Sequence, residues 1–304
     1  LMQRGQAEYS LGELERAYAD LRCAKELAFT TDEVLLQANI SHDLGVAARA
    51  LGHLSEALEN YSIALKMWER LQNPGAATSV LNNLGYIYYL KGESQEAEKI
   101  LQDGLKRARE ARALRYEALT LSTLGDVYKD SGDYAKALEI YGQGLHVAQQ
   151  AHYAYAENYI RVATGDTYRL LGDIGNACEW LNAALDDARL RGSATEIGQV
   201  QLALGLLAAD QGRLAEALST LSEVSGIFKQ AGDKRLEALA TFHLAHLLYL
   251  QGREGESAHH LMRVAELADL LGYDHFLVVA GRTTEVTLRF ASTLDSVGSK
   301  FKRI

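Results

Sequence analysis

The amino-acid sequence predicts an all-α protein, a right-handed superhelical solenoid of helix-turn-helix repeats. Three observations carry this prediction. Proline occurs once, at Pro74, and 48% of the 304 residues are apolar; because proline interrupts helices, its near absence suits long helices. Glycine recurs at two fixed positions of a 40-residue period, and alanine recurs at a third.

The first repeated glycine marks the middle of the first helix of each pair. It lies inside apolar runs such as residues 80–88, where a missing side chain allows a neighbouring helix to approach closely. We therefore expect these glycines to be packing positions. The series consists of Gly5, Gly45, Gly85, Gly125, Gly165 and Gly205.

The second repeated glycine follows seven residues later and marks the end of that first helix. A glycine at this place can adopt the left-handed conformation that closes a helix. Asp133 and Asp173 come directly after it, and an aspartate there can accept from the first N–H groups of the next helix. This series consists of Gly12, Gly52, Gly92, Gly132, Gly172, Gly212 and Gly252.

The repeated alanine lies in the first turn or so of the second helix. Only a small side chain at this place lets the two helices of a pair cross at close range, so we expect each member to be buried. The series consists of Ala17, Ala57, Ala97, Ala137, Ala177 and Ala217, with Ser257 in the seventh place.

At these positions the chain resembles the tetratricopeptide repeat (TPR), whose pattern includes Leu-Gly-x-x-Tyr and a later Ala-x-x-x-aromatic. The match covers residues 1 to about 270 and includes Leu84-Gly85 with Tyr88, Leu124-Gly125 with Tyr128, Ala57 with Tyr61, and Ala137 with Tyr141. The period is 40 residues instead of 34, which predicts about 16 to 18 residues in each helix. This longer form resembles the repeat domain of MalT-like bacterial transcriptional activators and related signalling ATPases.

The period also predicts the domain organisation. Residues 1–272 should form about seven repeats, the first of them truncated because Leu1 falls inside its first helix. Residues 273–304 should form a capping helix and tail, with one helix over residues 274–292 and a frayed basic end from Lys300 to Arg303. The truncated first helix favours a segment of a longer chain.

Composition limits the partners and the compartment. The formal net charge is -9 and no block of five like charges occurs, so direct nucleic-acid binding is not expected. There is no run of 18 apolar residues and no signal-peptide pattern at the N-terminus, which predicts a soluble cytoplasmic protein without a membrane partner. Cys23 and Cys178 lie four repeats apart and are expected to be buried free thiols.

The resemblance implies that first-helix side chains line a concave groove that binds a protein or peptide. Asn82, Asn83, Tyr86 and Tyr89 are the main candidates, because an amide offers a donor and an acceptor to a peptide backbone. Among the positions carried over from the resemblance, the predicted ligand-binding residues are Asn39, His42, Arg49, Asn82, Asn83, Tyr86, Tyr89, Asp126, Lys129, Tyr159, Asp166, Arg169, His243 and His246.

Other interpretations of these residues stay open. Asp126 with Lys129, and Asp166 with Arg169, are i, i+3 pairs that can be ordinary solvated ion pairs. The tyrosines can be packing residues, and the asparagines can face water. The histidine pairs 243/246 and 259/260 suit a metal poorly, because no carboxylate or cysteine completes a tetrahedral set. We expect no metal and no cofactor.

The sequence contains no phosphate-binding loop, no H-E-x-x-H and no G-x-S-x-G motif, so we expect no enzyme activity. The predicted function is protein–protein interaction, as the interaction or sensor arm of a bacterial transcriptional regulator or signalling ATPase. Its partner could be another domain of the same chain, and a small-molecule effector is a further possibility. The alternative is a stand-alone scaffold that binds an extended peptide.

Overall fold

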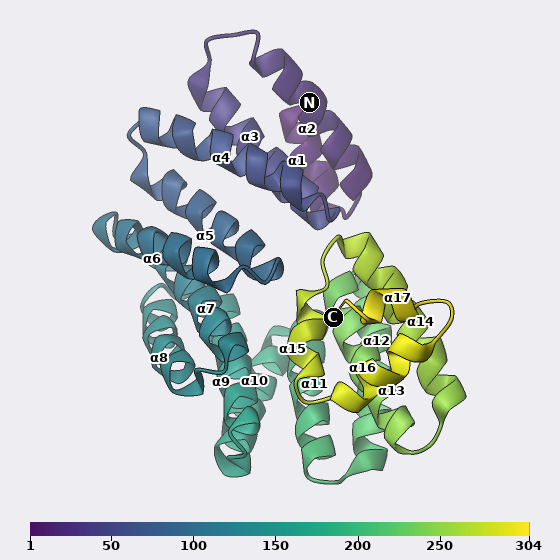
Figure 1. Ribbon diagram of the computed structural model, residues 1–304. Helices are drawn as coiled ribbons and strands as arrows, with labels where there is room; N and C mark the ends of the chain where they lie inside the picture. The colour runs from purple at the N-terminus through teal and green to yellow at the C-terminus, as the bar shows by residue number, and fades with distance from the viewer. Residues whose placement is uncertain (304) are drawn as a thin grey trace. The chain divides into compact units, whose positions relative to one another are not determined.

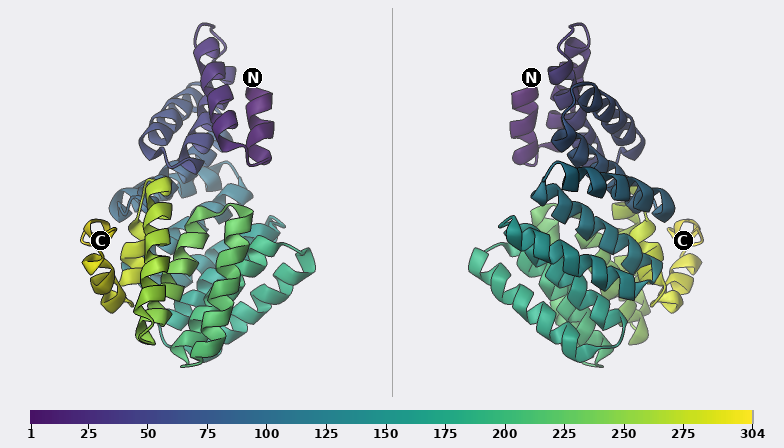
Figure 2. Two further views of the ribbon diagram at one scale, coloured as in Figure 1. Left: turned by 90° about the vertical axis from the view of Figure 1, so that its right-hand side faces the viewer. Right: turned by 90° about the vertical axis from the view of Figure 1, so that its left-hand side faces the viewer.

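The computed structural model describes residues 1–303, and within this range it contains helices and no strands (Figures 1 and 2). The helices are α1 (Met2–Ser10), α2 (Leu14–Ala28), α3 (Val34–Ala50), α4 (Leu54–Arg70), α5 (Pro74–Leu90), α6 (Ser94–Glu110), α7 (Leu114–Ser131), α8 (Tyr134–Gln150), α9 (Ala154–Leu170), α10 (Ile174–Arg191), α11 (Ala194–Asp210), α12 (Leu214–Ala231), α13 (Lys234–Leu250), α14 (Glu254–Leu271), α15 (His275–Gly281), α16 (Glu285–Thr293) and α17 (Gly298–Phe301).

The helices from α1 to α14 form pairs that follow the 40-residue period. We call the odd-numbered member of each pair the A helix and the even-numbered member the B helix. The B helices α2, α4, α10 and α12 each pack on their own A helix and on the A helix of the next pair, as α4 does on α3 and α5. Neighbouring A helices also touch, as α9 and α11 do. The predicted all-α class is confirmed.

The chain divides into two compact units. Unit 1 consists of residues 1–127 and 146–152, and unit 2 consists of residues 128–145 and 153–304, so the boundaries fall within α7 and α8. Each unit has its own apolar core. In unit 1 the core includes Leu21, Ile40, Leu44 and Ala47, and in unit 2 it includes Leu181, Val200, Leu221, Phe228, Leu244 and Leu261.

The first glycine series fits its predicted packing role. A Cβ added at Gly85 would lie 2.5 Å from Cγ of Leu101, and one at Gly165 would lie 2.7 Å from Cγ of Leu181. Both leucines belong to the B helix of the same pair and are fully buried. Gly205 is packed more loosely, with its nearest neighbours at 3.3 Å. The missing side chain therefore sets how closely the two helices of a pair can approach.

The second glycine series has the predicted left-handed backbone, with φ from 74° to 86°. The carboxylates of Asp133 and Asp173 accept from the backbone N–H groups of Lys136 and Asn176, each at 3.1 Å, and so cap the following helices. A further left-handed series ends the B helices, and the sequence did not reveal it because glycine fills only half of its places. Its members are Gln72, Arg112, His152, Gly192, Gly232 and Gly272.

The alanine series is fully buried at all six places, as expected. The seventh member, Ser257, is also fully buried, and its hydroxyl donates to the backbone oxygen of Ala245 at 2.8 Å. A buried hydroxyl without a partner would be costly, but this bond across the helix crossing satisfies it. Serine can therefore replace alanine at this position without a larger gap between the helices.

The expected single helix over residues 274–292 is wrong, because the chain breaks between α15 and α16. The hydroxyls of Thr283 and Thr284 both donate to the backbone oxygen of Ala280, which competes with continued helix bonding. The turn brings Leu288 against Gly281, where an added Cβ would lie 2.2 Å from the leucine. A side chain at residue 281 would force Leu288 to move.

The expected frayed end from Lys300 to Arg303 is wrong for Lys300 and Phe301, whereas Lys302 and Arg303 are exposed. Lys300 is buried, and its ammonium group donates to the backbone oxygen of Ala265 at 2.9 Å and pairs with Asp269. Phe301 is 3% exposed and belongs to an apolar cluster with Phe242. Helices α15 to α17 therefore cover the apolar side of the last helix pair.

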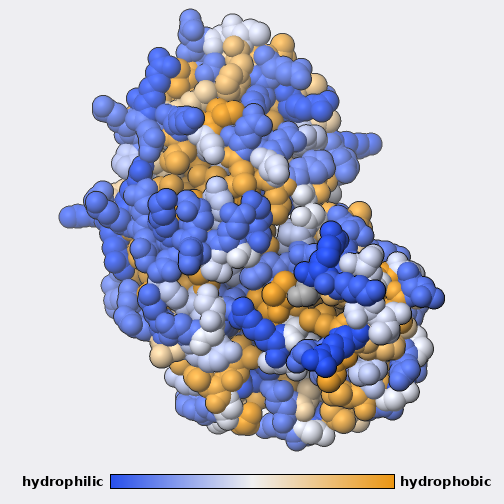
Figure 3. Space-filling view, viewed as in Figure 1, coloured by the Kyte–Doolittle hydropathy of each residue, from blue (hydrophilic) through white to orange (hydrophobic). Residues whose placement is uncertain are grey.

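Hydrophilic side chains cover most of the face of the molecule shown in Figure 3, with apolar ones between them. Cys23 is exposed, which contradicts the expectation of a buried thiol, because it lies on the outward side of α2; Cys178 is partly buried, and both are free. Among residues 1–303, no helix combines the length and apolar character needed to cross a membrane.

Candidate functional site

Most of the predicted site residues lie on one side of the A helices, which we call the A-helix face. It comprises the residues six, three and two positions before the packing glycine and one and four positions after it. For Gly45 these are Asn39, His42, Asp43, Val46 and Arg49. Because these positions cover less than half of the helix circumference, their side chains share one face.

In unit 1 the A-helix face joins α1, α3 and α5 through polar contacts. Gln6 donates to Asp43 at 2.7 Å, and Asn83 Nδ2 lies 3.2 Å from His42 Nε2. His42 Nδ1 in turn lies 3.4 Å from Oδ1 of Asp43. The structure thus brings His42 and Asn83 together, as expected for residues of one surface.

The aromatic part of this face lies beside those contacts. The guanidinium of Arg49 stands 5.4 Å from the ring centre of Tyr86, and the rings of Tyr86 and Tyr89 are 5.9 Å apart. Asn82 is partly buried, and its Oδ1 is enclosed without a hydrogen-bond partner. Asn39 is partly buried on the same face. Contacts thus join Arg49 to Tyr86 and Tyr86 to Tyr89, and Asn39 and Asn82 share this face by their helical register.

In unit 2 the A-helix face carries an ion network. Asp166 accepts from Arg169 at 2.8 Å and lies 3.4 Å from the ammonium of Lys129, while Arg169 also donates to Asp210 at 2.7 Å. Burial opposes the charged carboxylate, but the charges of Arg169 and Lys129 outweigh it and lower the pKa of Asp166 to about 2. The predicted i, i+3 pair exists, and it also links α7, α9 and α11.

Two predicted site residues have little exposed surface. Asp126 is 3% exposed and His243 is 9% exposed. Burial, aided by the charge of Arg169, lowers the pKa of His243 to about 3, so this imidazole is neutral at pH 7. Tyr159 is partly buried on α9. Asp126 and His243 thus pack inside their units, and neither side chain is open to solvent.

The other histidines considered for a metal site lie on two different helices, His246 on α13 and the pair His259 and His260 on α14. His246 on α13 has Nδ1 at 2.7 Å from the hydroxyl of Thr287, and burial lowers its pKa. The rings of His259 and His260 are 5.8 Å apart on α14, the B helix. In the part of the chain that the structure describes, no three His, Cys, Asp or Glu side chains lie close enough together to hold a metal ion.

Gln6 and Asp210 are not among the predicted groove residues, although the sequence contains a signal for them. Residues that touch across neighbouring A helices are separated by 37 or 41 positions, as in Gln6 with Asp43 and Arg169 with Asp210. The separations bracket the 40-residue period, because the contacts run diagonally between adjacent helices. Complementary side chains at these two separations could have identified the contacts.

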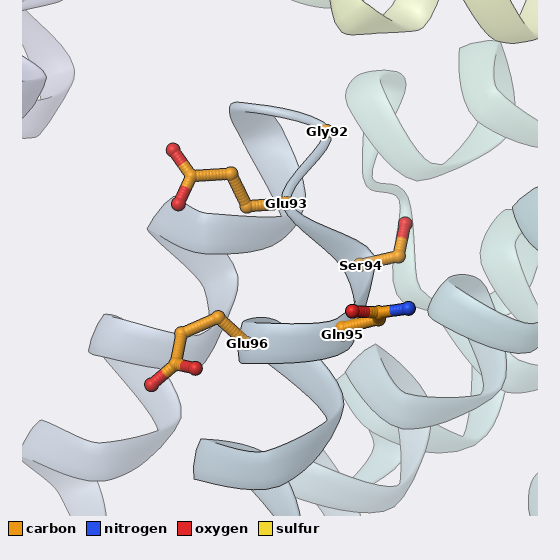
Figure 4. Close-up of a pocket in the computed structure, with 5 residues that line it drawn as sticks. All are labelled: Gly92, Glu93, Ser94, Gln95 and Glu96. Carbon is orange, nitrogen blue, oxygen red and sulfur yellow. The ribbon is translucent and has the colours of Figure 1, made fainter.

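A surface pocket of about 440 Å³ lies at the turn between α5 and α6, away from the A-helix face, and is lined by Gly92, Glu93, Ser94, Gln95 and Glu96 (Figure 4). The two carboxylates point away from the side chains of Ser94 and Gln95. Glu93 pairs with Lys91 at 2.5 Å, and Glu96 pairs with Lys99 at 3.4 Å. Because its groups do not converge, this pocket is not our candidate site.

Comparisons with known proteins place the chain in a family. The model of the MalT-like TPR region matches residues 72–284, and a comparison with curated proteins found no match. The apo form of RapI is 13% identical, with a TM-score of 0.73 over 89% of this chain and 97% of that one.

Two further structures share the fold. The Rap conjugation gene regulator of plasmid pLS20, in complex with the Phr* peptide, is 14% identical, with a TM-score of 0.73 over 89% of this chain and 73% of that one. A STAND signal-transduction ATPase from Pyrococcus horikoshii with a TPR sensor is 20% identical, with a TM-score of 0.60 over 94% of this chain and 43% of that one. The predicted TPR-type superhelical solenoid is thereby confirmed, and the chain belongs to the MalT-like TPR region family.

Proposed function

We propose that this chain is a non-catalytic domain whose A-helix face binds an extended peptide segment of a protein partner. The observation that carries the proposal is the unit 1 surface of α3 and α5. There Asn82, Asn83, Tyr86 and Tyr89 stand in a row of partly buried side chains beside His42 and Arg49. Such a row offers amide groups for a peptide backbone and aromatic rings for its side chains.

The enclosed Oδ1 of Asn82 favours a ligand with N–H donors. A buried acceptor without a partner costs about 1 to 3 kcal/mol, and a peptide N–H would remove that cost. Packed helices lie about 10 Å apart and an extended peptide advances about 3.3 Å per residue, so about six residues would cross α1, α3 and α5. A hexapeptide is therefore a suitable minimal probe.

We further propose that the domain is the interaction or sensor arm of a cytoplasmic bacterial transcriptional regulator or signalling ATPase. The family supports this role, since its name refers to a MalT-like region, and so does the repeat sensor of the STAND protein. The Rap regulator bound to the Phr* peptide supports a peptide as the ligand. A stand-alone scaffold that binds an extended peptide is the second candidate, and the row of amide and aromatic side chains on α3 and α5 supports it equally.

The non-catalytic part of the proposal is supported by how the perturbed ionisable groups are used. Asp166 is held charged between two cations, and His243 is held neutral in a buried place. A general acid or base must exchange a proton near the working pH. With pKa values of about 2 and about 3, neither group does so at pH 7.

Exchanging both asparagines for alanine should weaken peptide binding and leave the fold intact. The probe is a degenerate hexapeptide mixture with free carboxyl ends, and the measurement is the amount of peptide retained by the protein in gel filtration. Two lost hydrogen bonds of about 0.5 to 1.5 kcal/mol each predict a loss of roughly tenfold or more in affinity for Asn82→Ala/Asn83→Ala. Asn182→Ala, on the exposed side of α10, is the control and should bind as the wild type does. Equal retention by the double variant would remove these residues from the site.

The regulator and the scaffold are distinguished by the full-length reading frame and by the class of ligand. A DNA-binding or nucleotide-binding module in the same frame supports the regulator. In a thermal-shift screen, a peptide that raises the melting temperature supports peptide binding. A response to sugars or metabolites with no response to peptides would instead support a small-molecule sensor.

A further inference from the structure

The repeats allow a comparison of one position in several copies. The residue four positions after the packing glycine is a cation in three of them, namely Arg49, Lys129 and Arg169. In unit 2, both cations are paired with Asp166, and Arg169 is also paired with Asp210. The place that Asp166 takes in its own repeat is taken by Val46 beside Arg49. The carboxylate that neutralises the cation in unit 2 is therefore replaced by an apolar side chain in unit 1.

Arg49 has no ion-pair partner among residues 1–303. Its Nε is enclosed and makes no hydrogen bond, and its guanidinium faces the ring of Tyr86. Burial opposes the charged form of Arg49, and the side chains that favour it are the phenols of Tyr61, Tyr86 and Tyr9, none of which is a carboxylate. An enclosed cation without an anion costs free energy, which a bound anion would recover.

A second enclosed donor lies in the same place. The hydroxyl of Tyr61, on α4, is buried without a hydrogen-bond partner and interacts with Arg49. Burial raises the pKa of Tyr61 to about 12, so the phenol keeps its proton at pH 7. The nearby carboxylate of Asp43 accepts from Gln6 at 2.7 Å. The place around Arg49 thus offers N–H and O–H donors and no anion paired with them.

We propose that Arg49 and Tyr61 form a binding site for a single carboxylate group of the ligand. The assignment deepens the proposed function, because it names the group of the peptide that unit 1 recognises: its C-terminal carboxylate or an acidic side chain. A planar guanidinium donates to a carboxylate through two N–H groups, and the phenol can donate to the same group.

The charge balance favours a carboxylate over a phosphate. One unpaired guanidinium neutralises one negative charge, whereas a phosphate ester carries about 1.5 to 2 negative charges at pH 7. The second charge would lie among aromatic rings and near Asp43, in a chain whose formal net charge is -9. A monoanion is therefore the better match.

The site can be tested directly with small probes by NMR of the arginine Nε–Hε groups, with the Arg49 signal assigned from its loss in Arg49→Gln. Sodium acetate at constant ionic strength should shift the Arg49 signal with saturation. The signal of Arg169, which already donates to Asp166, is the internal control and should not move. Neutral acetamide should have no effect. Absence of a saturable shift, or an equal shift at Arg169, would overturn the proposal, and tighter binding of inorganic phosphate than of acetate would overturn the choice of carboxylate.

A variant that restores the unit 2 arrangement provides the matched test. Val46→Asp places a carboxylate where Asp166 stands relative to Arg169, so it should abolish the acetate response while Arg49 is retained. A folded Val46→Asp protein that still responds to acetate with wild-type affinity would contradict the site. If that variant does not fold, the same question can be tested with peptides and Arg49→Gln. This variant should lower the retention of free-acid hexapeptides about tenfold, to the level of their C-terminal amides. Equal retention of free acids by Arg49→Gln and wild type would contradict the site.

The two proposals fail in different ways. If the wild type retains hexapeptides but acetate does not shift the Arg49 signal, the carboxylate site is wrong and peptide binding stands. If acetate shifts the signal but no hexapeptide is retained, the carboxylate site stands and peptide binding is wrong.

Discussion

Alanine at position 85 is expected to lower the free energy of unfolding by about 2 kcal/mol. The added Cβ would lie 2.5 Å from Cγ of Leu101, a fully buried side chain on the partner helix α6. Because the contact is with the branch point of the leucine rather than with its end, α5 and α6 must move apart, and overpacking of this kind costs about 1 to 3 kcal/mol. Urea unfolding followed by circular dichroism measures the effect.

The control is the same substitution at Gly226, a helical residue of α12 with no atom within 4 Å of the added Cβ. There alanine should stabilise the protein by up to about 1 kcal/mol, because it is the better helix former. A Gly85→Ala variant that is as stable as Gly226→Ala would show that the first glycine series has no packing role.

Asp166→Asn is expected to destabilise unit 2 by about 2 to 3 kcal/mol. The carboxylate is 20% exposed and lies between Lys129 and Arg169, which are 17% and 11% exposed, so its loss removes the anion that two largely enclosed cations share. Removing one partner of a fully buried pair costs about 3 to 5 kcal/mol, and the partial exposure reduces that figure. Thermal unfolding of the variant at pH 7 provides the measurement.

The pH dependence of this effect has a definite sign. The pKa of Asp166 is about 2 in the folded protein, below the ordinary value of about 3.9. The stabilisation is thus fully present above about pH 4 and is lost as the pH falls towards 2, so the difference between wild type and Asp166→Asn should shrink over that range. Glu256→Gln, in an exposed pair with Arg253, is the control and should change the stability very little at pH 7. A loss of stability in Asp166→Asn no larger than that in Glu256→Gln would show that the network stabilises the protein no more than an exposed ion pair does.

The sequence predicted the helix pairs because their spacing depends on backbone requirements. The left-handed end of a helix at Gly92 and the close packing at Gly85 both require glycine. The 40-residue period can therefore be recognised from the glycine positions in the sequence. The left-handed helix ends at Gln72, Arg112 and His152 were not predicted, because these residues adopt a positive φ without being glycine. The amino-acid type therefore does not indicate the conformation. The break at residues 282–284 was not predicted because no proline marks it.

The candidate site was predicted less completely than the fold. Register assigned His42, Asn83, Arg49 and Tyr86 to one face, and the structure places them there. Burial did not follow from register, because it depends on neighbouring helices: Asp126 shares that register position with Tyr86 and is nevertheless enclosed. Whether these residues bind a ligand remains a prediction.

Hydrogen exchange, followed by mass spectrometry in the presence of the retained hexapeptides, tests the central claim most directly. If the A-helix face is the ligand surface, the peptides should slow exchange in α3 and α5 and leave the B helices α4 and α6 unchanged. Slower exchange confined to α4, α6 or the turn at residues 92–96 would contradict the account.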